Sequence, residues 1–227
     1  ERLLTNTDEI KQLQVTVDAW SSSAKGVGGD FYFIRKISDN RFFASLCDVS
    51  GKGVTAALVV SIVWGFLRSC DMHKGLKKIL ESLNSSIISS FHLEKYLTGF
   101  FLIYDAETRQ LQAADMGHSH TLYVRNGQNA SMKKIRGNLP IGIEPDIKPM
   151  VYSLPVQDGD TLVIYTDGIT EQDNPAGEEF GEERLTALVR KAAVQNKPLS
   201  EILPKALDNF RQNTPQHDDM TFLLFRF

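Results

Sequence analysis

Short apolar segments separated by turns recur along the chain, and they constrain its fold more than any other feature. Residues 31–37 and 41–47 are separated only by residues 38–40, which is the signal of a β-hairpin. Asn126-Gly127 is a strong two-residue turn signal of the same kind. Strands joined by such short turns pair antiparallel. The pattern predicts further strands at residues 13–20, 99–104, 110–116, 121–125, 131–135, 151–154, 161–166 and 220–227.

Four other segments predict helices. Residues 56–67 are apolar nearly all round, which favours a helix from residue 55 to about 69 that is buried on more than one side. Two further helices are expected at 182–194 and 200–211, the second only if Pro204 falls in its first turn. Hairpins combined with helices predict an α+β fold, most simply two antiparallel sheets face to face with helices outside. The remaining helix, at 74–91, is amphipathic, and its apolar face comprises Leu76, Leu80, Leu83, Ile87 and Phe91.

Composition excludes several classes of protein. A net charge of −3 without a polybasic stripe argues against nucleic acid as a partner. Cys47 and Cys70 form no Cys-x-x-Cys pattern and are expected to be buried thiols in a reducing compartment. The longest apolar run, 56–67, is too short to cross a bilayer core of about 30 Å, and no signal peptide is present. We therefore expect no membrane insertion and a cytoplasmic location.

The beginning of the sequence suggests a piece of a longer protein, because the chain starts at Glu1 rather than Met. Residues 1–12 are polar and charged with a few Leu and Ile, and we expect them to be the end of an upstream linker. One domain is expected over residues 13–227, since the composition does not shift along the chain. A missing upstream region could tether the full-length protein to a membrane.

Asp48 marks the first candidate functional position. It ends the apolar stretch 42–47 and opens a turn that contains Gly51 and Gly53. A carboxylate on a turn whose glycines let backbone approach a ligand is a typical place to hold a metal ion. A glycine-rich turn before a helix is also ordinary turn chemistry, and this alternative stays open. The turn is not a Walker A loop, because Leu46 stands where that motif requires its first glycine.

Further acidic residues share this context. Asp30 follows two glycines and precedes a predicted strand, and Asp167 ends a predicted strand before a glycine. Asp218-Asp219 directly precedes the last strand. Each alone could be a turn or cap residue, but converging carboxylates would repel one another unless cations neutralised them. All-oxygen ligands favour Mg²⁺ or Mn²⁺, and two such ions about 3.5–4 Å apart can activate a shared water toward phosphorus.

Five motifs that contain these residues follow one another along the chain. They are Val27-Gly28-Gly29-Asp30-Phe31-Tyr32, Cys47-Asp48-Val49-Ser50-Gly51-Lys52-Gly53-Val54, Gly117-His118, Tyr165-Thr166-Asp167-Gly168-Ile169-Thr170-Glu171 and Asp218-Asp219-Met220-Thr221. Their order and spacing resemble the metal-dependent protein serine/threonine phosphatases (the PPM class), in the bacterial SpoIIE/RsbU-like branch. The resemblance covers residues 15–227. It implies an α-β-β-α sandwich of two antiparallel sheets with a site for two Mn²⁺ or Mg²⁺ ions.

The resemblance also implies roles for single residues. Asp48 would bridge the two ions, and the backbone carbonyl of Val49 would contribute to the second. Asp167 and Asp218 would bind the first ion, and Asp30 would be a direct ligand or hold metal-bound water. In that class the metal-bound water attacks the phosphate directly, without a phosphoenzyme. Asp30, Asp48, Asp167 and Asp218 are therefore the candidate catalytic residues.

Some positions depart from the family pattern or extend it. Asp219 is a further candidate ligand, at a position where relatives often carry Asn. Ser50 stands nearest the place where animal-type enzymes have a His that protonates the leaving group. The phosphate-binding residue is unknown, since no counterpart of the animal-type Arg is evident and Lys25 and Lys52 are only guesses. We interpret His118 as a structural residue of a turn.

The resemblance implies hydrolysis of phosphoserine or phosphothreonine on a regulatory partner protein, often an anti-sigma-factor antagonist in this branch. It also implies an upstream sensor or linker domain, and a homodimer through the helices at 56–67 and 74–91. One alternative is a catalytically silent PPM-fold binding module that sequesters a signalling partner. Another is a two-metal enzyme acting on nucleotides, which would need a base pocket and a phosphate loop that the sequence does not show.

Overall fold

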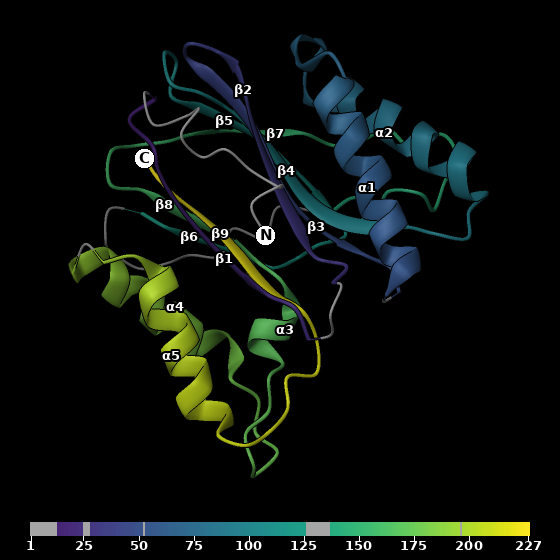
Figure 1. The fold of residues 1–227 in the computed structure, drawn as a ribbon. Coiled ribbons are helices and arrows are strands. Elements are labelled where there is room, and N and C mark those ends of the chain that lie inside the picture. The colour runs from purple at the N-terminus through teal and green to yellow at the C-terminus, as the bar shows by residue number, and fades with distance from the viewer. Residues whose placement is uncertain (1–12, 25–27, 52, 126–136, 196) are drawn as a thin grey trace. The chain divides into compact units, whose positions relative to one another are not determined.

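A computed structural model of the chain describes residues 13–24, 28–51, 53–125, 137–195 and 197–227 (Figure 1). Tertiary contacts divide the chain into two compact units. Unit 1 comprises Glu1–Val15, Val27–Ser119 and Lys134–Val156, and unit 2 comprises Thr16–Gly26, His120–Lys133 and Gln157–Phe227. None of the described helices is both long and apolar enough to cross a membrane.

Each unit contains one sheet, and every strand pair in both sheets is antiparallel. The strand order is β2-β3-β4-β5-β7 in unit 1 and β1-β9-β8-β6 in unit 2. The prediction of an α+β fold with two antiparallel sheets and helices is confirmed. The strands are β1 (Thr16–Ser22), β2 (Phe31–Ser38), β3 (Arg41–Val49), β4 (Leu97–Asp105), β5 (Gln110–Met116), β6 (Thr121–Val124), β7 (Tyr152–Pro155), β8 (Thr161–Tyr165) and β9 (Met220–Arg226).

In unit 1 two long helices, α1 (Val54–Ser69) and α2 (Leu76–Phe91), lie on one face of the sheet (Figure 1). A short 3₁₀ turn, Met72–Lys74, separates them. The predicted apolar face of α2 is buried except for its last member, Phe91, which is half-buried. These side chains share one core cluster with aromatic residues of the sheet such as Phe43 and Phe101. Burial of this apolar area holds the helix pair on the sheet.

In unit 2 the helices α4 (Gly181–Gln195) and α5 (Leu199–Arg211) pack against the four-stranded sheet (Figure 1). Their buried positions recur at helical spacing and share a core cluster with β8 and β9, as expected for amphipathic helices. A third, four-residue helix, α3 (Asp167–Thr170), follows β8 directly. The sequence pattern did not predict α3, because one helical turn carries no periodicity.

The prediction for α1 was wrong in one respect. Its fully buried side chains, Ala56, Val59, Val63 and Leu67, form a single stripe, and Val60, Ile62, Trp64 and Phe66 are half-buried against the same core, so the helix is not buried all round. On the remaining surface Val54 is 76% and Leu58 is 56% exposed. The apolar sequence is therefore not explained by the core alone.

Pro204 differs from its expected place, since it is the sixth residue of α5 and lies in the second turn. Its ring removes one internal hydrogen bond from the helix, and the buried Leu199, Leu203 and Leu207 compensate by packing against the sheet. Cys47 is a buried free thiol as predicted, but Cys70 is only half-buried.

Several strand boundaries also shift. The first strand begins at Thr16 instead of residue 13, although Leu13 and Val15 are buried. Strand β3 continues through Val49, so Asp48 lies inside the strand and pairs with Thr98. The predicted strand 131–135 and the Asn126-Gly127 turn lie outside the described residues, as does the linker segment 1–12.

Candidate active site

Asp30 and Asp48 lie at the same end of the β2–β3 hairpin in unit 1. Asp30 precedes Phe31, whose partner across the ladder is Cys47, the residue before Asp48. Gly29 faces the same turn: a Cβ placed on it would lie 3.0 Å from the carbonyl oxygen of Val49 and 3.4 Å from Asp48 Oδ1. The absent side chain at Gly29 therefore lets the backbone next to Asp30 approach Asp48 and the Val49 carbonyl.

The electrostatics of the buried Cys47 thiol support this proximity. Burial is the main reason why the pKa of Cys47 is raised, and the negative charges of Asp48 and Asp30 raise it further. Both carboxylates therefore lie near enough to the buried Cys47 thiol for their charges to raise its pKa. Two carboxylates in the same region repel each other, and a bound cation would relieve this repulsion.

The turn that follows β3 is fixed by hydrogen bonds to the segment before β4. The Ser50 backbone N–H donates to the Tyr96 carbonyl at 3.0 Å, and the Tyr96 N–H donates to Ser50 Oγ at 3.1 Å. Gly51 and Gly53 adopt φ values of 97° and 77°, which favour glycine and turn the chain into α1. Ser50, expected near the place of a catalytic His, thus has a structural role in this turn.

In unit 2 the second pair of predicted ligands is brought together by Thr166. Its N–H donates to the Thr221 carbonyl at 2.9 Å, and its Oγ accepts the Thr221 N–H at 2.9 Å. These bonds fix the start of α3, where Asp167 is the first residue, beside the start of β9. Asp218 is two residues before β9 and so belongs to the same junction.

Gly168 shows how closely these two segments approach. A Cβ on Gly168 would lie 2.2 Å from the Asp219 carbonyl oxygen, a distance at which no side chain fits. Because Gly168 is not in the positive-φ region, space and not backbone conformation requires glycine here. The glycine after Asp167 therefore allows the contact between the α3 start and the segment of Asp218.

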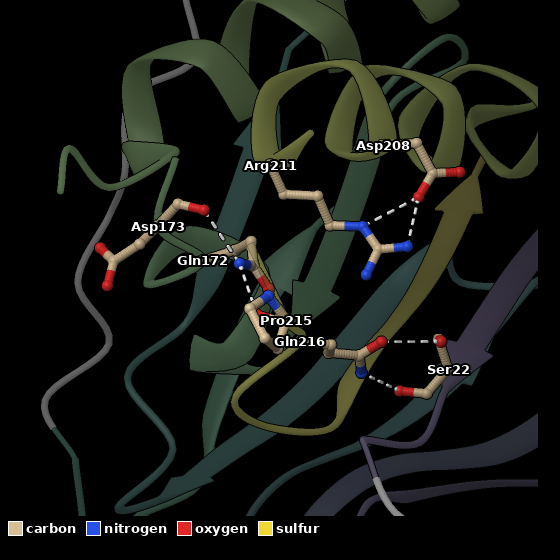
Figure 2. Close-up of polar contacts among 7 residues, drawn as sticks. All are labelled: Ser22, Gln172, Asp173, Asp208, Arg211, Pro215 and Gln216. Atoms are coloured by element: carbon tan, nitrogen blue, oxygen red, sulfur yellow. Dashed lines mark hydrogen bonds and ion pairs between the residues drawn. The ribbon is translucent and has the colours of Figure 1, made fainter. Parts of the chain in front are cut away.

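Two glutamines that no sequence motif marks fix the segment before β9 (Figure 2). Gln216 Nε2 donates to the carbonyls of Ser22, at 2.7 Å, and Asp218, at 2.8 Å, while Ser22 Oγ donates to Gln216 Oε1. Gln172 Nε2 donates to the Pro215 carbonyl at 3.2 Å. The contacts with Ser22 and Pro215 join residues far apart in the chain, so no local sequence signal marks them.

Glu171 and Asp219 complete the acidic surroundings in unit 2. Partial burial raises the pKa of Glu171, and the neighbouring charge of Asp167 raises it further, with smaller effects from Glu179 and Asp218. Asp219 Oδ1 accepts the Ala24 N–H at 2.9 Å, which anchors the segment after β1. One oxygen of Asp219 is therefore already used by the protein.

The structure thus places the segments of Asp30 and Asp48 side by side in unit 1, and those of Asp167 and Asp218 side by side in unit 2. All of these donors are oxygens, a chemistry that fits Mg²⁺ or Mn²⁺. Among the residues that the structure describes, no group of three or more His, Cys, Asp and Glu side chains is arranged to hold a metal ion. The joint action of the two pairs, which belong to different units, stays a prediction.

Of the other predicted residues, His118 is buried, and its backbone N–H donates to Asp115 Oδ1 at 2.7 Å. The Ser119 N–H donates to the other oxygen of the same carboxylate at 3.0 Å, so this turn is organised around Asp115. A structural role for His118 agrees with these contacts. The two lysines suggested for phosphate, Lys25 and Lys52, lie outside the described residues.

Comparison with known proteins assigns the chain to a family. The family model of Stage II sporulation protein E (SpoIIE) matches residues 38–227. This chain belongs to the SpoIIE family. It is 24% identical to the phosphoserine phosphatase RsbU of Bacillus subtilis, in a match that covers 100% of this chain and 67% of RsbU. It is also 24% identical to the phosphoserine phosphatase RsbP of the same organism, with 96% of this chain and 54% of RsbP covered.

A solved structure shares the fold of this SpoIIE-family chain. The SiaA-PP2C domain of Pseudomonas aeruginosa superposes with a TM-score of 0.80 at 24% identity, over 97% of this chain and 89% of that domain. The predicted membership in the PPM-type, SpoIIE/RsbU-like phosphatase family is confirmed. The chain spans only about half the length of RsbP.

Proposed function

We propose that this domain hydrolyses phosphoserine or phosphothreonine on a regulatory partner protein. The observation that carries the proposal is the pairing of acids at two glycine-dependent contacts. Gly29 lets Asp30 approach Asp48, and Gly168 lets the segment of Asp167 approach that of Asp218. Carboxylates held this way, in a chain whose relatives are phosphoserine phosphatases, fit metal-assisted hydrolysis better than turn capping.

In this proposal Asp48, the Val49 carbonyl, Asp30, Asp167 and Asp218 would hold two Mn²⁺ or Mg²⁺ ions, with Asp48 as the shared ligand. The ions, when bound, would lower the pKa of a coordinated water and neutralise charge on the phosphoryl group. The chain's part is to fix these oxygens before substrate arrives. Asp219, whose Oδ1 accepts the Ala24 N–H, is a further candidate ligand in this proposal.

The silent binding module is not favoured, because the named relatives are phosphatases and none of the predicted acidic ligands is missing from the chain. For the substrate we propose a phosphorylated regulatory protein, such as an anti-sigma-factor antagonist. We also propose that an upstream sensor or linker domain regulates the activity of this domain.

The direct test is phosphate release from a phosphoserine peptide and from p-nitrophenyl phosphate. We expect release that requires added Mn²⁺ or Mg²⁺ and is abolished by EDTA, because the attacking water depends on the ions. Restoration by excess Mn²⁺ is the control for damage caused by the chelator. Full activity in EDTA, or no hydrolysis at any metal concentration, would contradict the proposal.

We further propose that the exposed apolar surface of α1 contacts a second copy of this chain. Val54 and Leu58 are one turn apart and both largely exposed, and burial of such side chains favours association. Light scattering of the domain at high concentration should give a dimer, and a Val54→Asp/Leu58→Asp variant should be monomeric. The exposed Asn209→Asp on α5 is the control for added charge. A wild-type monomer at high concentration would refute the contact.

A further inference from the structure

Lys95 occupies a distinctive position in unit 1. It is half-buried in the segment between α2 and β4. Its Nζ lies 3.6 Å from where a Cβ on Gly51 would be, and therefore beside the turn that follows Asp48 and Val49. No motif in the sequence singles out this lysine.

The backbone around Lys95 is held on both sides. On one side the Ser50 and Tyr96 hydrogen bonds join it to the turn after β3. On the other side Leu97 and Ile141 exchange both backbone hydrogen bonds, at 2.9 and 3.0 Å. These bonds align three short segments, and we call Ser50, Gly51, Lys95, Tyr96 and Ile143, together with the buried Gly142 beneath them, the Lys95 platform.

Gly142 makes the third segment fit. Its φ is 97°, and a Cβ there would lie 2.6 Å from the Lys95 carbonyl oxygen and 3.2 Å from Tyr96 Cα. Asn84, a fully buried residue of α2, supports the same loop, because its Oδ1 accepts the Gly142 N–H at 2.8 Å and its Nδ2 donates to the Glu144 carbonyl at 2.7 Å. The platform is thus a preorganised surface and not a loose loop.

The chemistry of the platform combines a cation with apolar surface. Within the described parts of the chain, no carboxylate forms an ion pair with Lys95. Beside it, Tyr96 is 44% and Ile143 is 42% exposed. A lysine ammonium that no carboxylate of the described residues pairs with favours binding of an anion, and exposed apolar side chains on a fixed frame favour a peptide contact.

We propose that the Lys95 platform binds the phosphorylated segment of the protein substrate. The Lys95 ammonium donates to a phosphoryl oxygen, while Tyr96 and Ile143 contact an apolar side chain that flanks the phosphorylated residue. This inference rests on the proposed phosphatase function and adds the phosphate-binding residue that the sequence could not name. It specifies the substrate as a phosphorylated segment with an apolar neighbour.

The test compares Lys95→Ala, Lys95→Arg and Tyr96→Ala with the wild-type domain in the presence of Mn²⁺. Substrates are a phosphoserine peptide with apolar flanking residues and p-nitrophenyl phosphate, and inorganic phosphate is the inhibitor. Loss of a charge-assisted hydrogen bond should lower kcat/KM of Lys95→Ala for both substrates, and weaken phosphate inhibition, by about tenfold or more. Lys95→Arg should recover part of this loss, because it retains the charge.

Tyr96→Ala should separate the two substrates, since only the peptide reaches the apolar surface. We expect its kcat/KM for the peptide to fall about fivefold more than its value for p-nitrophenyl phosphate. Lys77→Ala, which removes an exposed lysine of α2, is the matched control and should behave as wild type. If Lys95→Ala does not fold, as judged by thermal unfolding, Lys95→Gln takes its place.

The outcomes separate this inference from the function on which it rests. Wild-type hydrolysis of both substrates, with Lys95→Ala and Tyr96→Ala kinetics equal to those of Lys77→Ala, would overturn the platform and leave the phosphatase intact. A wild-type domain that hydrolyses neither substrate would overturn the proposed function itself. Phosphate inhibition that is weakened most in Lys95→Ala, less in Lys95→Arg and not in Lys77→Ala would support the assignment.

Discussion

Asp48→Asn should remove at least 99% of metal-dependent phosphate release from a phosphoserine peptide, a loss of about 100-fold or more. Residues that only support a metal ligand already account for about 10–100-fold in affinity or activity when they are changed. Asp48 is proposed to hold both ions, so its neutral amide should have a larger effect. Because Asn has nearly the same shape, the β3–β4 pairing at Thr98 should persist.

Asp39→Asn is the matched control for this substitution. Asp39 lies in the same β2–β3 hairpin but at its opposite end, where its side chain is 96% exposed and pairs only with Lys36 among the described residues. This ion pair is at the surface and contributes little, so the variant should keep wild-type activity and stability. Asp48→Asn with activity equal to Asp39→Asn would remove Asp48 from the proposed ligand set.

The second large effect is expected from Gly168→Ala. One methyl group at this position would meet the Asp219 carbonyl oxygen at 2.2 Å, so the start of α3 and the start of β9 must separate. Misplacement of catalytic groups by about 1 Å can lower the rate about 100-fold, and forced packing changes of this kind destabilise by about 1–3 kcal/mol. Phosphate release and thermal unfolding measure the two effects.

Gly65→Ala is the control for Gly168→Ala. It tests whether the loss of activity comes from the clash of the added methyl group or from replacing any glycine with alanine. Gly65 lies inside α1, and a Cβ there meets no atom within 4 Å. Alanine favours a helix by about 1 kcal/mol over glycine, so this variant should be as active as wild type and no less stable. If Gly168→Ala were as active as Gly65→Ala, the close approach at α3 would not matter for catalysis.

The fold was largely predictable because its elements are encoded locally. The hairpin of β2 and β3 and the amphipathic pattern of α2 each depend on residues a few positions apart. The burial of α1 was not predictable, since an apolar sequence does not reveal which face meets the sheet. Pro204 shows the same limit, because the packing of α5 compensates for an unfavourable residue inside it.

The candidate site was predictable to the level of its acids, and less so for the residues around them. Asp30, Asp48 and Asp167 follow from motifs that carry their own glycines, and Asp218 follows from the acidic pair directly before the last strand. Their supports do not: the Gln216 side chain reaches Ser22, 194 positions away in the sequence. Lys95 likewise becomes notable only when β4 places it beside the turn after Asp48.

Calorimetric titration with Mn²⁺, carried out on the wild-type domain and on Asp48→Asn, tests the central claim most directly. If these acids jointly hold two divalent ions, the wild-type domain should bind Mn²⁺ with a stoichiometry of two, and Asp48→Asn should lose binding, because the shared ligand is gone. A wild-type domain that binds no Mn²⁺, or an Asp48→Asn variant that binds it like wild type, would contradict the account.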